Sequence, residues 1–359
     1  MKSLYWQPRR HSRPMLALLA FVAAAAWLWV ERYPVNRQEP YFAEKVKASE
    51  LARHAFEILK DERKKRNEPV DPSVDPSGSG LMGRLVTSIT TGTGIASAKQ
   101  TSINPNFAAV VLLLLKRAGV QPGHAVAVGL SGSFPALNVA TLAAIQTLGA
   151  HSVTISSVGS SQWGANLPNL TWLDMENALV SRGVFEHRSV AVSAGGIDDR
   201  ALGLEGDGKL AIDEAIARSG LPLLAPNDLA DSIEKRMLLY RAGAGDRPLR
   251  AFVNVGGGTS SVGTRIGKEL FTPGLNRTLP RGAPPDSVMA RFLADGIPVI
   301  HLSRIELLAR EHGLPSRPTT LPIVGKGPIF VRAAPSREFA AGAIVLILGL
   351  AFGLLRRAA

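Results

Sequence analysis

Apolar residues form one uninterrupted run near each end of the chain and short segments between these runs. The first run, Met15 to Val30, reads MLALLAFVAAAAWLWV, and the second, Phe339 to Leu355, reads FAAGAIVLILGLAFGLL. Neither run contains a charged residue, and each is close to the minimum of about 17 residues for a helix that spans a bilayer. The pattern therefore predicts two transmembrane helices, at 15–30 and 339–355.

The first run has a second interpretation. A secretory signal peptide also joins a basic start to an apolar stretch, and the alanines at 23–26 offer small residues for cleavage. The run continues past them through Trp27 and Trp29, and tryptophan is typical of the membrane interface. We favour a retained span and leave cleavage open. For the second run, a buried helical hairpin is the alternative.

Basic residues beside the two runs predict the orientation. Residues 1–14 hold four basic side chains and no acid, and Arg356 and Arg357 follow the second run. Lys and Arg close to a span favour the cytoplasmic side. We therefore expect basic cytoplasmic ends at 1–14 and 356–359. The region between the spans, with all 29 acidic residues, would lie outside the cytoplasmic (inner) membrane.

Residues 31–80 predict a charged helix and a linker. Glu39–Arg66 spaces its apolar residues as an amphipathic helix does. Asn67–Gly80 reads NEPVDPSVDPSGSG, and this Pro, Asp, Ser and Gly content is typical of a loop.

Between residues 81 and 335, short apolar segments alternate with helical ones. Six segments predict strands: HAVAVGL (124–130), HSVTISSV (151–158), RSVAVSA (188–194), LPLLAP (221–226), LRAFVNV (249–255) and PVIHL (298–302). Short strands separated by helices are typical of βαβ units. We therefore predict one α/β domain with a doubly wound, mostly parallel sheet, Rossmann-like in architecture.

Candidate ligand-binding residues follow the predicted strands. In such sheets, ligands bind beyond the carboxyl ends of the strands, where the strand order reverses. The loops at these positions are rich in hydroxyl, amide and glycine groups, which suit a carboxylate or a phosphate. The candidates are Ser131, Gly132, Ser133, Ser161, Gln162, Trp163, Asn166, Gly257, Gly258, Thr259 and Ser260.

The segment VAVGLSGSFPALN, at 126–138, matches none of the specific loop motifs. A serine replaces the last glycine of Gly-x-Ser-x-Gly, the glycine spacing misses Gly-x-Gly-x-x-Gly, and no lysine follows as in a P-loop. Two interpretations stay open: an anion-binding loop, or a tight turn in which Ser133 caps the next helix. The segment GGGTSS, at 256–261, is equally compatible with a ligand loop and with a turn that needs positive φ angles.

A catalytic alternative uses the same loops. Ser131 or Ser133 would be the nucleophile of a hydrolase or transferase, and Asp174 or Asp198 would be a supporting acid. Solvated or capping roles are favoured for the acids. The chain has no cysteine, which excludes disulfides and thiolate chemistry. Its histidines are not spaced as metal ligands, so we expect neither a metal nor a cofactor.

The charge is uneven along the chain. Residues 241–337 hold 14 Lys or Arg and six Asp or Glu. A basic outer region predicts an acidic partner, such as a polyanion or the headgroups of a lipid bilayer. The outer location and the lack of interleaved aromatic residues argue against nucleic acid.

Several separated segments resemble those of a known family. These are TSINPNFAAVV, VAVGLSGSFPALN, SSVGSSQWGAN, TWLDME, FVNVGGGTSSVG and IPVIHL. Together they resemble the bacterial poly-gamma-glutamate system proteins, which are membrane-tethered. The resemblance covers roughly residues 81–330 and carries no assigned catalytic residue.

This resemblance implies a membrane-anchored accessory protein of poly-gamma-glutamate (capsule polymer) synthesis or export. Its extracytoplasmic domain would bind the polymer, another polyanion or the membrane subunits of the synthase. A non-catalytic role is favoured. The alternative is a hydrolase or transferase acting on glutamyl amide bonds. A cytoplasmic nucleotide-binding role is a third possibility, and it requires the reversed topology.

Overall fold

The computed structural model describes residues 13–282 and 284–357, so most of the predicted basic end 1–14 and residues 358–359 lie outside the described residues. The chain divides into two compact units. One is formed by the two ends of the chain, and the other is Pro40–Phe330.

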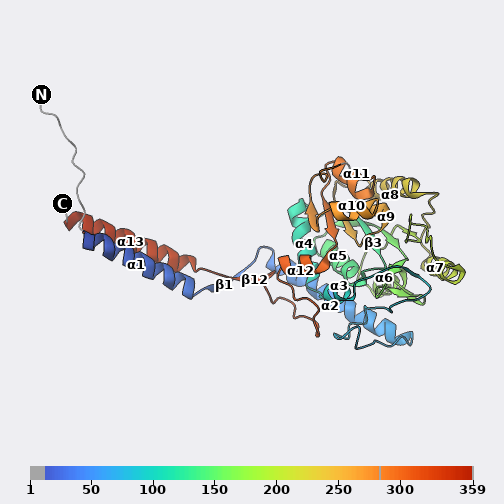
Figure 1. Ribbon diagram of the computed structural model, residues 1–359, viewed down its shortest axis with the longest axis horizontal. Coiled ribbons are helices and arrows are strands. Elements are labelled where there is room, and N and C mark those ends of the chain that lie inside the picture. The colour runs from blue at the N-terminus through green and yellow to red at the C-terminus, as the bar shows by residue number, and fades with distance from the viewer. Residues whose placement is uncertain (1–12, 283, 358–359) are drawn as a thin grey trace, which may run out of the picture. The chain divides into compact units, whose positions relative to one another are not determined.

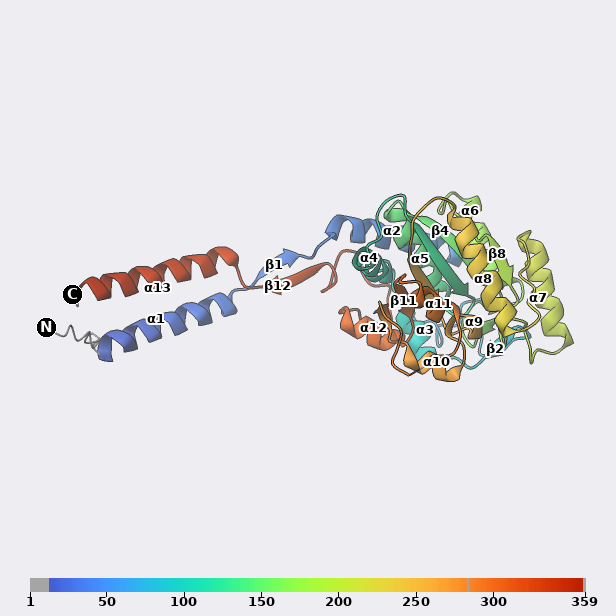
Figure 2. The same ribbon diagram turned by 90° about the horizontal axis from the view of Figure 1, so that it is seen from above.

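The terminal unit contains two long helices and a two-stranded ribbon. Helices α1 (Arg13–Arg32) and α13 (Arg337–Arg357) lie side by side (Figure 2). Strands β1 (Val35–Gln38) and β12 (Val331–Ala334) pair antiparallel. Both helices are long and apolar enough to cross a membrane, and none of the residues in their apolar windows is buried. They are candidate spans, a little longer than the predicted runs.

The second unit is built around a sheet that helices surround (Figure 1). The sheet has six strands in the order β10-β11-β9-β3-β4-β8. The strands are β3 (Ala125–Ser131), β4 (His151–Ser157), β8 (Ala191–Ser193), β9 (Leu249–Val255), β10 (Gly274–Asn276) and β11 (Val299–Leu302). Only β10 runs antiparallel to its neighbour. The prediction of an α/β fold with a mostly parallel sheet is therefore confirmed.

Helices cover both faces of this sheet. One face carries α4 (Phe107–Ala118), α5 (Pro135–Thr147) and α6 (Trp172–Ser181), with α2 (Phe42–Lys65) packed against all three. The other face carries α8 (Leu229–Ala244), α9 (Thr259–Val262) and α11 (Val288–Ala294). A core that includes Tyr240, Phe252 and Phe292 joins α8, β9 and α11. Burial of the sheet by helices on both faces explains why the strands read as almost continuous apolar runs.

Further helices and strands surround the sheet. They are α3 (Ala96–Ser102), α7 (Gly206–Ser219), α10 (Arg265–Leu270), α12 (Ile305–Glu311), the parallel pair β2 (Thr90–Gly92) and β5 (Ser160–Ser161), and the antiparallel pair β6 (Asn166–Leu167) and β7 (Leu170–Thr171).

One predicted strand is replaced by another. The segment 221–226 contributes only an isolated bridge between Leu223 and Val192, while Gly274–Asn276 forms the sixth strand. Two prolines, Pro222 and Pro226, bracket the first segment. Because proline has no N–H, that segment cannot complete a ladder of hydrogen bonds. The three residues of β10 were too few to produce a hydrophobic pattern.

The predicted boundary at residue 81 falls inside a compact unit. Helix α2 buries Ala48, Ala52, Phe56 and Leu59 against α4, α5 and α6. The loop 67–80 is also ordered by internal bonds, because the buried Asp75 carboxylate accepts the backbone N–H groups of Ser79 and Gly80. The charged segment is therefore a covering helix of the α/β unit.

Candidate functional site at the carboxyl edge of the sheet

The strand order reverses between β3 and β9. Strand β3 leads into α5 on one face, and β9 leads into α9 on the opposite face. The two loops begin in contact: the Ser131 hydroxyl donates to the Val255 carbonyl at 3.2 Å. Gly256 has a φ of 99°, and a Cβ there would lie 2.6 Å from the Ser131 Oγ. Glycine is therefore required where the loops diverge.

Internal hydrogen bonds hold the loop 131–135 in place. The Ser133 N–H donates to the Ser131 Oγ at 3.3 Å, and the Asn138 Nδ2 donates to the Ser131 carbonyl at 2.9 Å. The Ser133 Oγ accepts the Ser161 N–H at 3.1 Å. Phe134, and not Ser133, occupies the N-cap of α5, and no side chain caps that helix. The prediction that Ser133 caps α5 is wrong, because the loop after β4 occupies its hydroxyl.

Gly132 lets the loops after β3 and β4 approach each other closely. Its carbonyl accepts the Ser160 hydroxyl at 3.0 Å and the Ala165 N–H at 2.7 Å. A Cβ on Gly132 would lie 2.7 Å from the Val158 carbonyl oxygen. The predicted residues Ser131, Gly132, Ser133 and Ser161 are therefore brought together in one tightly packed group.

A lysine that the sequence did not single out joins this group. The Lys99 ammonium, from α3, donates to the Ser133 carbonyl and to the Ser161 Oγ, the latter at 2.8 Å. It also lies 3.9 Å above the centre of the Phe134 ring. Lys99 is only 3% exposed. No local pattern marks this lysine, because its partners come from loops more than thirty residues away.

Three of the other predicted residues hold the segment 84–94 against the edge. The Gln162 Oε1 accepts the Gly94 N–H at 3.1 Å, and the Trp163 N–H donates to the Arg84 carbonyl. The Asn166 amide is fully buried and exchanges two hydrogen bonds with the Arg84 backbone, at 2.9 and 2.8 Å. These polar groups therefore serve the fold in the observed structure.

Serines end three neighbouring strands at the same level. Ser131 pairs in register with Ser157, and Ser157 pairs with Ser193. The hydroxyls of Ser157 and Ser193 lie 3.0 Å apart, and the Ser193 hydroxyl donates to the Asp199 carboxylate at 2.6 Å. A continuous row of hydroxyls therefore crosses the carboxyl edge and ends at a buried acid.

Asp199 forms a buried ion pair with Arg236 of α8. Their closest atoms are 2.6 Å apart, and each side chain is 3% exposed. Arg236 also donates to the Ser193 Oγ at 2.7 Å, and the Ser232 hydroxyl donates to Asp199 at 2.8 Å. Burial disfavours the charged guanidinium, but the Asp199 carboxylate outweighs this, so the pKa of Arg236 is raised. The pair fixes the loop after β8 to α8.

The two acids proposed for catalysis lie elsewhere. Asp174 accepts the Thr171 N–H at 2.8 Å and forms ion pairs with Arg218 and Arg66. Asp198 is half-buried next to Asp199, with a φ of 52°. Within residues 13–282 and 284–357, neither carboxylate is hydrogen-bonded to Ser131 or Ser133.

A buried histidine and asparagine lie at the ends of β9 and β11. Asn254 and His301 are opposite each other in the parallel register, and the Asn254 Nδ2 lies 3.0 Å from the His301 Nδ1. The same amide donates to the Gly256 carbonyl at 2.9 Å. Because Nδ2 is a donor, the His301 Nδ1 accepts and its proton is placed on Nε2. The pair supports the start of the GGGTSS loop.

In the GGGTSS loop, some positions are required by the fold and others are exposed to solvent. Gly256 needs its positive φ, whereas Gly258 has a φ of −61° and open space where a Cβ would stand. Gly257 and Gly258 are exposed, Thr259 is half-buried, and Ser260 is buried. Of the predicted residues, Gly257 and Gly258 are therefore the ones most accessible to a ligand.

Glu176 of α6 is a fully buried acid outside this edge. Its carboxylate accepts the Ser189 hydroxyl at 2.7 Å and the Ser189 N–H at 3.2 Å. Burial raises its pKa to about 7, against the opposing effect of these hydrogen bonds. The group therefore changes charge close to neutral pH.

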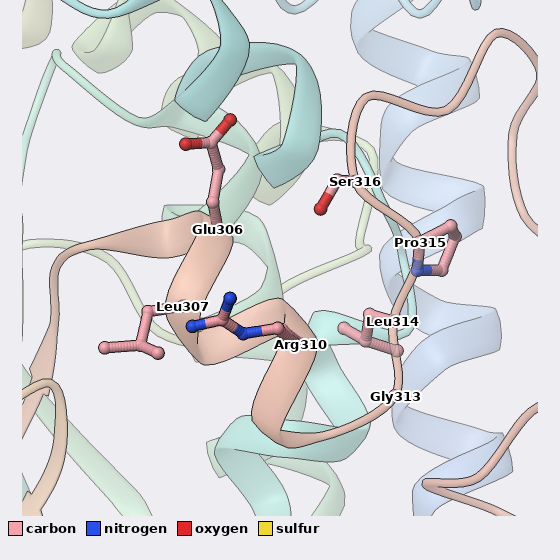
Figure 3. A pocket seen from close by; sticks show the side chains of 7 residues that line it. All are labelled: Glu306, Leu307, Arg310, Gly313, Leu314, Pro315 and Ser316. Atoms are coloured by element: carbon pink, nitrogen blue, oxygen red, sulfur yellow. The ribbon is translucent and has the colours of Figure 1, made fainter.

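A surface cavity of 730 Å³ lies beside α12, lined by Glu306, Leu307, Arg310, Gly313, Leu314, Pro315 and Ser316. Figure 3 shows Glu306, Leu307 and Arg310 projecting from the helix and the rest coming from the segment that follows it. None of the residues predicted from the sequence lines this cavity.

In the described part of the chain, no three His, Asp or Glu side chains are grouped so that they could hold a metal ion. Comparison with known proteins adds no assignment: no family model, no curated protein and no solved structure matches the chain.

Proposed function

We propose that the protein is a membrane-anchored accessory protein of poly-gamma-glutamate synthesis or export. Its domain is Rossmann-like and extracytoplasmic, and it binds the polymer at the switch point between β3 and β9. The observation that carries the proposal is that both ends of one α/β unit continue into apolar helices long enough to cross a membrane. The family resemblance suggests poly-gamma-glutamate as the polymer that is bound. The membrane subunits of the synthase are the further partner in this proposal.

The switch point supports binding of a polymer rich in carboxylates. The N-terminal end of helix α5, with its positive dipole, lies at this edge, and helix N-termini favour anions. Gly257 and Gly258 are exposed there and allow close approach of a ligand to the backbone. The strand order, with its reversal between β3 and β9, supports the Rossmann-like assignment.

A charge introduced at the switch point tests the proposal. The full chain is reconstituted in nanodiscs, and its binding to poly-gamma-glutamate is measured with an uncharged polymer as reference. Gly258→Asp places a carboxylate in open space at an exposed position, so we expect affinity for the polymer to fall at least tenfold. Gly206→Asp, also exposed and unobstructed but at the start of α7, is the matched control. Equal affinities in the two variants would reject binding at this site.

A topology assay tests the location. A reporter that is active only outside the cytoplasmic membrane, inserted after Gly220 in the exposed turn that ends α7, should be active. The same reporter fused to the C-terminus should be inactive. The reverse result would favour the cytoplasmic nucleotide-binding alternative.

The second candidate is a hydrolase or transferase acting on glutamyl amide bonds. The row of strand-end serines motivates it, and Ser131 is half-buried at the switch point. Release of new amino groups from the polymer by the natural chain, and its loss in Ser131→Ala and Ser133→Ala, would establish this activity. Unchanged release in both variants would remove these serines as nucleophiles.

A further inference from the structure

The corner of the α/β unit from which both terminal segments leave carries a cluster of basic side chains. We call Lys45, Lys116, Arg117, Arg277 and His312 the basic corner. Lys116 and Arg117 end α4, Arg277 follows β10, and His312 follows α12. These elements all end at the amino edge of the sheet, opposite the candidate ligand site.

Direct contacts connect several members of the basic corner. The Arg277 guanidinium donates to the Arg117 carbonyl. Lys116 lies 5.1 Å above the ring of Tyr41 and 2.8 Å from Glu44. The pKa of His312 is lowered to about 4, chiefly by burial and then by the positive charges of Arg117 and Lys45. The cations of α2 and α4 and the largely uncharged His312 therefore lie in one region of the α/β unit.

Two of these cations are available to a partner. Arg117 and Arg277 are exposed, and neither forms an ion pair within the described residues. Glu44, next to Lys45 in sequence, pairs with Lys116, and Glu311 precedes His312. The net charge of the basic corner and these two acids is therefore positive.

Short connections limit how far the basic corner can lie from the candidate spans. Helix α1 ends at Arg32 and α2 begins at Phe42, while the α/β unit ends at Phe330 and α13 begins at Arg337. Fully extended, ten residues reach about 35 Å. The rings of Phe42 and Phe330 also pack edge to face, 6.3 Å apart, so both connections leave from the same place. Exposed cations close to a bilayer are attracted to anionic lipids.

We propose that the basic corner binds the anionic headgroups of the membrane in which the protein is anchored, through Arg117 and Arg277. Tyr41, which is 44% exposed beneath Lys116, supplies an amphipathic ring suited to the headgroup region. This binding keeps the amino edge of the sheet at the lipid surface and leaves the carboxyl edge open to the polymer. The inference rests on the membrane anchoring in the proposed function.

A single-cysteine label provides the test, because the natural chain has no cysteine. Thr278→Cys, next to Arg277, carries a fluorophore, and Glu205→Cys, at the start of α7, carries it in the reference sample. The full chain is reconstituted in vesicles of phosphatidylcholine, or of equal parts phosphatidylcholine and phosphatidylglycerol, each with a headgroup-labelled quenching lipid. We expect quenching at position 278 to be at least twofold greater in the anionic vesicles, with no such difference at position 205.

Charge variants identify the residues responsible. Arg117→Gln with Arg277→Gln should reduce quenching to the level in neutral vesicles, as should about 1 M NaCl, where the Debye length is about 3 Å. Arg200→Gln with Lys209→Gln removes the same charge at the opposite edge of the sheet and should leave quenching unchanged. Equal quenching in neutral and anionic vesicles, or equal effects of the two double variants, would overturn the inference.

Carbonate extraction separates this inference from the proposed anchoring. If the chain is extracted from the vesicles, the anchoring fails and the inference fails with it. If the chain resists extraction but shows no dependence on anionic lipid, only the basic corner is refuted.

Discussion

Basic side chains are buried and bonded at the carboxyl edge of the sheet, but exposed at its amino edge. At the carboxyl edge, Arg236 and Lys99 are buried, and their donors are taken up by a carboxylate, hydroxyls and a carbonyl. At the amino edge, Arg117 and Arg277 are exposed and have no carboxylate partner in the described structure. A buried cation without partners would be costly, whereas an exposed one is solvated. The same residue type therefore stabilises the fold at one edge and is available to a partner at the other.

The largest expected effect concerns the buried pair of the carboxyl edge. Asp199→Asn leaves the Arg236 guanidinium buried without a countercharge, so we expect the free energy of unfolding to fall by about 3–5 kcal/mol. Asp198→Asn is the matched control, since Asp198 has a similar positive φ and is half-buried. It should change stability by less than about 0.5 kcal/mol. Urea unfolding of the reconstituted chain measures both. A similar loss of unfolding free energy in the two variants would contradict a special role of the buried Asp199 carboxylate.

A pH series tests two buried groups whose effects oppose each other. Glu176 has its pKa raised from 4.5 to about 7, so the folded state holds a proton that the unfolded state has lost, and stability falls as the pH rises between these values. The shift corresponds to roughly 3 kcal/mol. His312, in the basic corner, has its pKa lowered from 6.5 to about 4, so stability falls as the pH drops between those values.

Single variants should reveal each response. With Glu176→Gln, the free energy of unfolding should rise more steeply between pH 4.5 and 6.5, because only the His312 contribution remains. With His312→Gln, it should fall over the same range. Urea midpoints at several pH values provide the slopes, and slopes equal to that of the natural chain would refute both assignments.

A smaller effect distinguishes the two glycine loops of the carboxyl edge. Gly132→Ala forces a Cβ to within 2.7 Å of the Val158 carbonyl oxygen, so we expect a loss of about 1–3 kcal/mol in unfolding free energy. Gly258→Ala enters open space at an ordinary φ of −61° and should alter stability by less than about 0.5 kcal/mol. Thermal unfolding compares them. A large loss for Gly258→Ala would show that this loop is structural throughout.

The smallest expected effect is at the amino edge. Arg117→Gln with Arg277→Gln removes two exposed charges that have no carboxylate partner among the described residues. We expect the unfolding free energy to stay within about 0.5 kcal/mol of that of the natural chain. Measured with urea in neutral detergent, a loss comparable to that of Asp199→Asn would show that these arginines serve the fold.

Regular elements were predictable wherever a hydrophobic pattern extended over several residues. The strands at 125–131, 151–157 and 249–255 lie within one residue of their predicted positions. The pattern failed for β10, whose three residues are set by pairing with β11, and for the segment 221–226, whose prolines cannot complete a ladder. Whether a short edge strand forms depends more on pairing with its neighbouring strand than on its own residue types.

The candidate site was predictable in position but not in its contacts. Glycine and serine after the strands indicated a cluster at the carboxyl edge of the sheet, and the structure brings Ser131, Gly132, Ser133 and Ser161 together there. Asp198 was selected from the sequence as a supporting acid and Asp199 was not, yet only Asp199 reaches Arg236, which is 37 residues away. Interactions over such separations leave no local pattern.

The sequence by itself determined the two apolar helices, the α/β class and the edge where strand-end loops collect, because each follows from periodicity and composition within a short window. Only the tertiary structure decided which polar groups are buried in hydrogen bonds or ion pairs within the fold and which remain accessible to solvent. Burial and partnership depend on residues far apart in the chain. Thus Asn166, Asp174 and Asp199 hold loops together, whereas Gly258, Arg117 and Arg277 face the solvent.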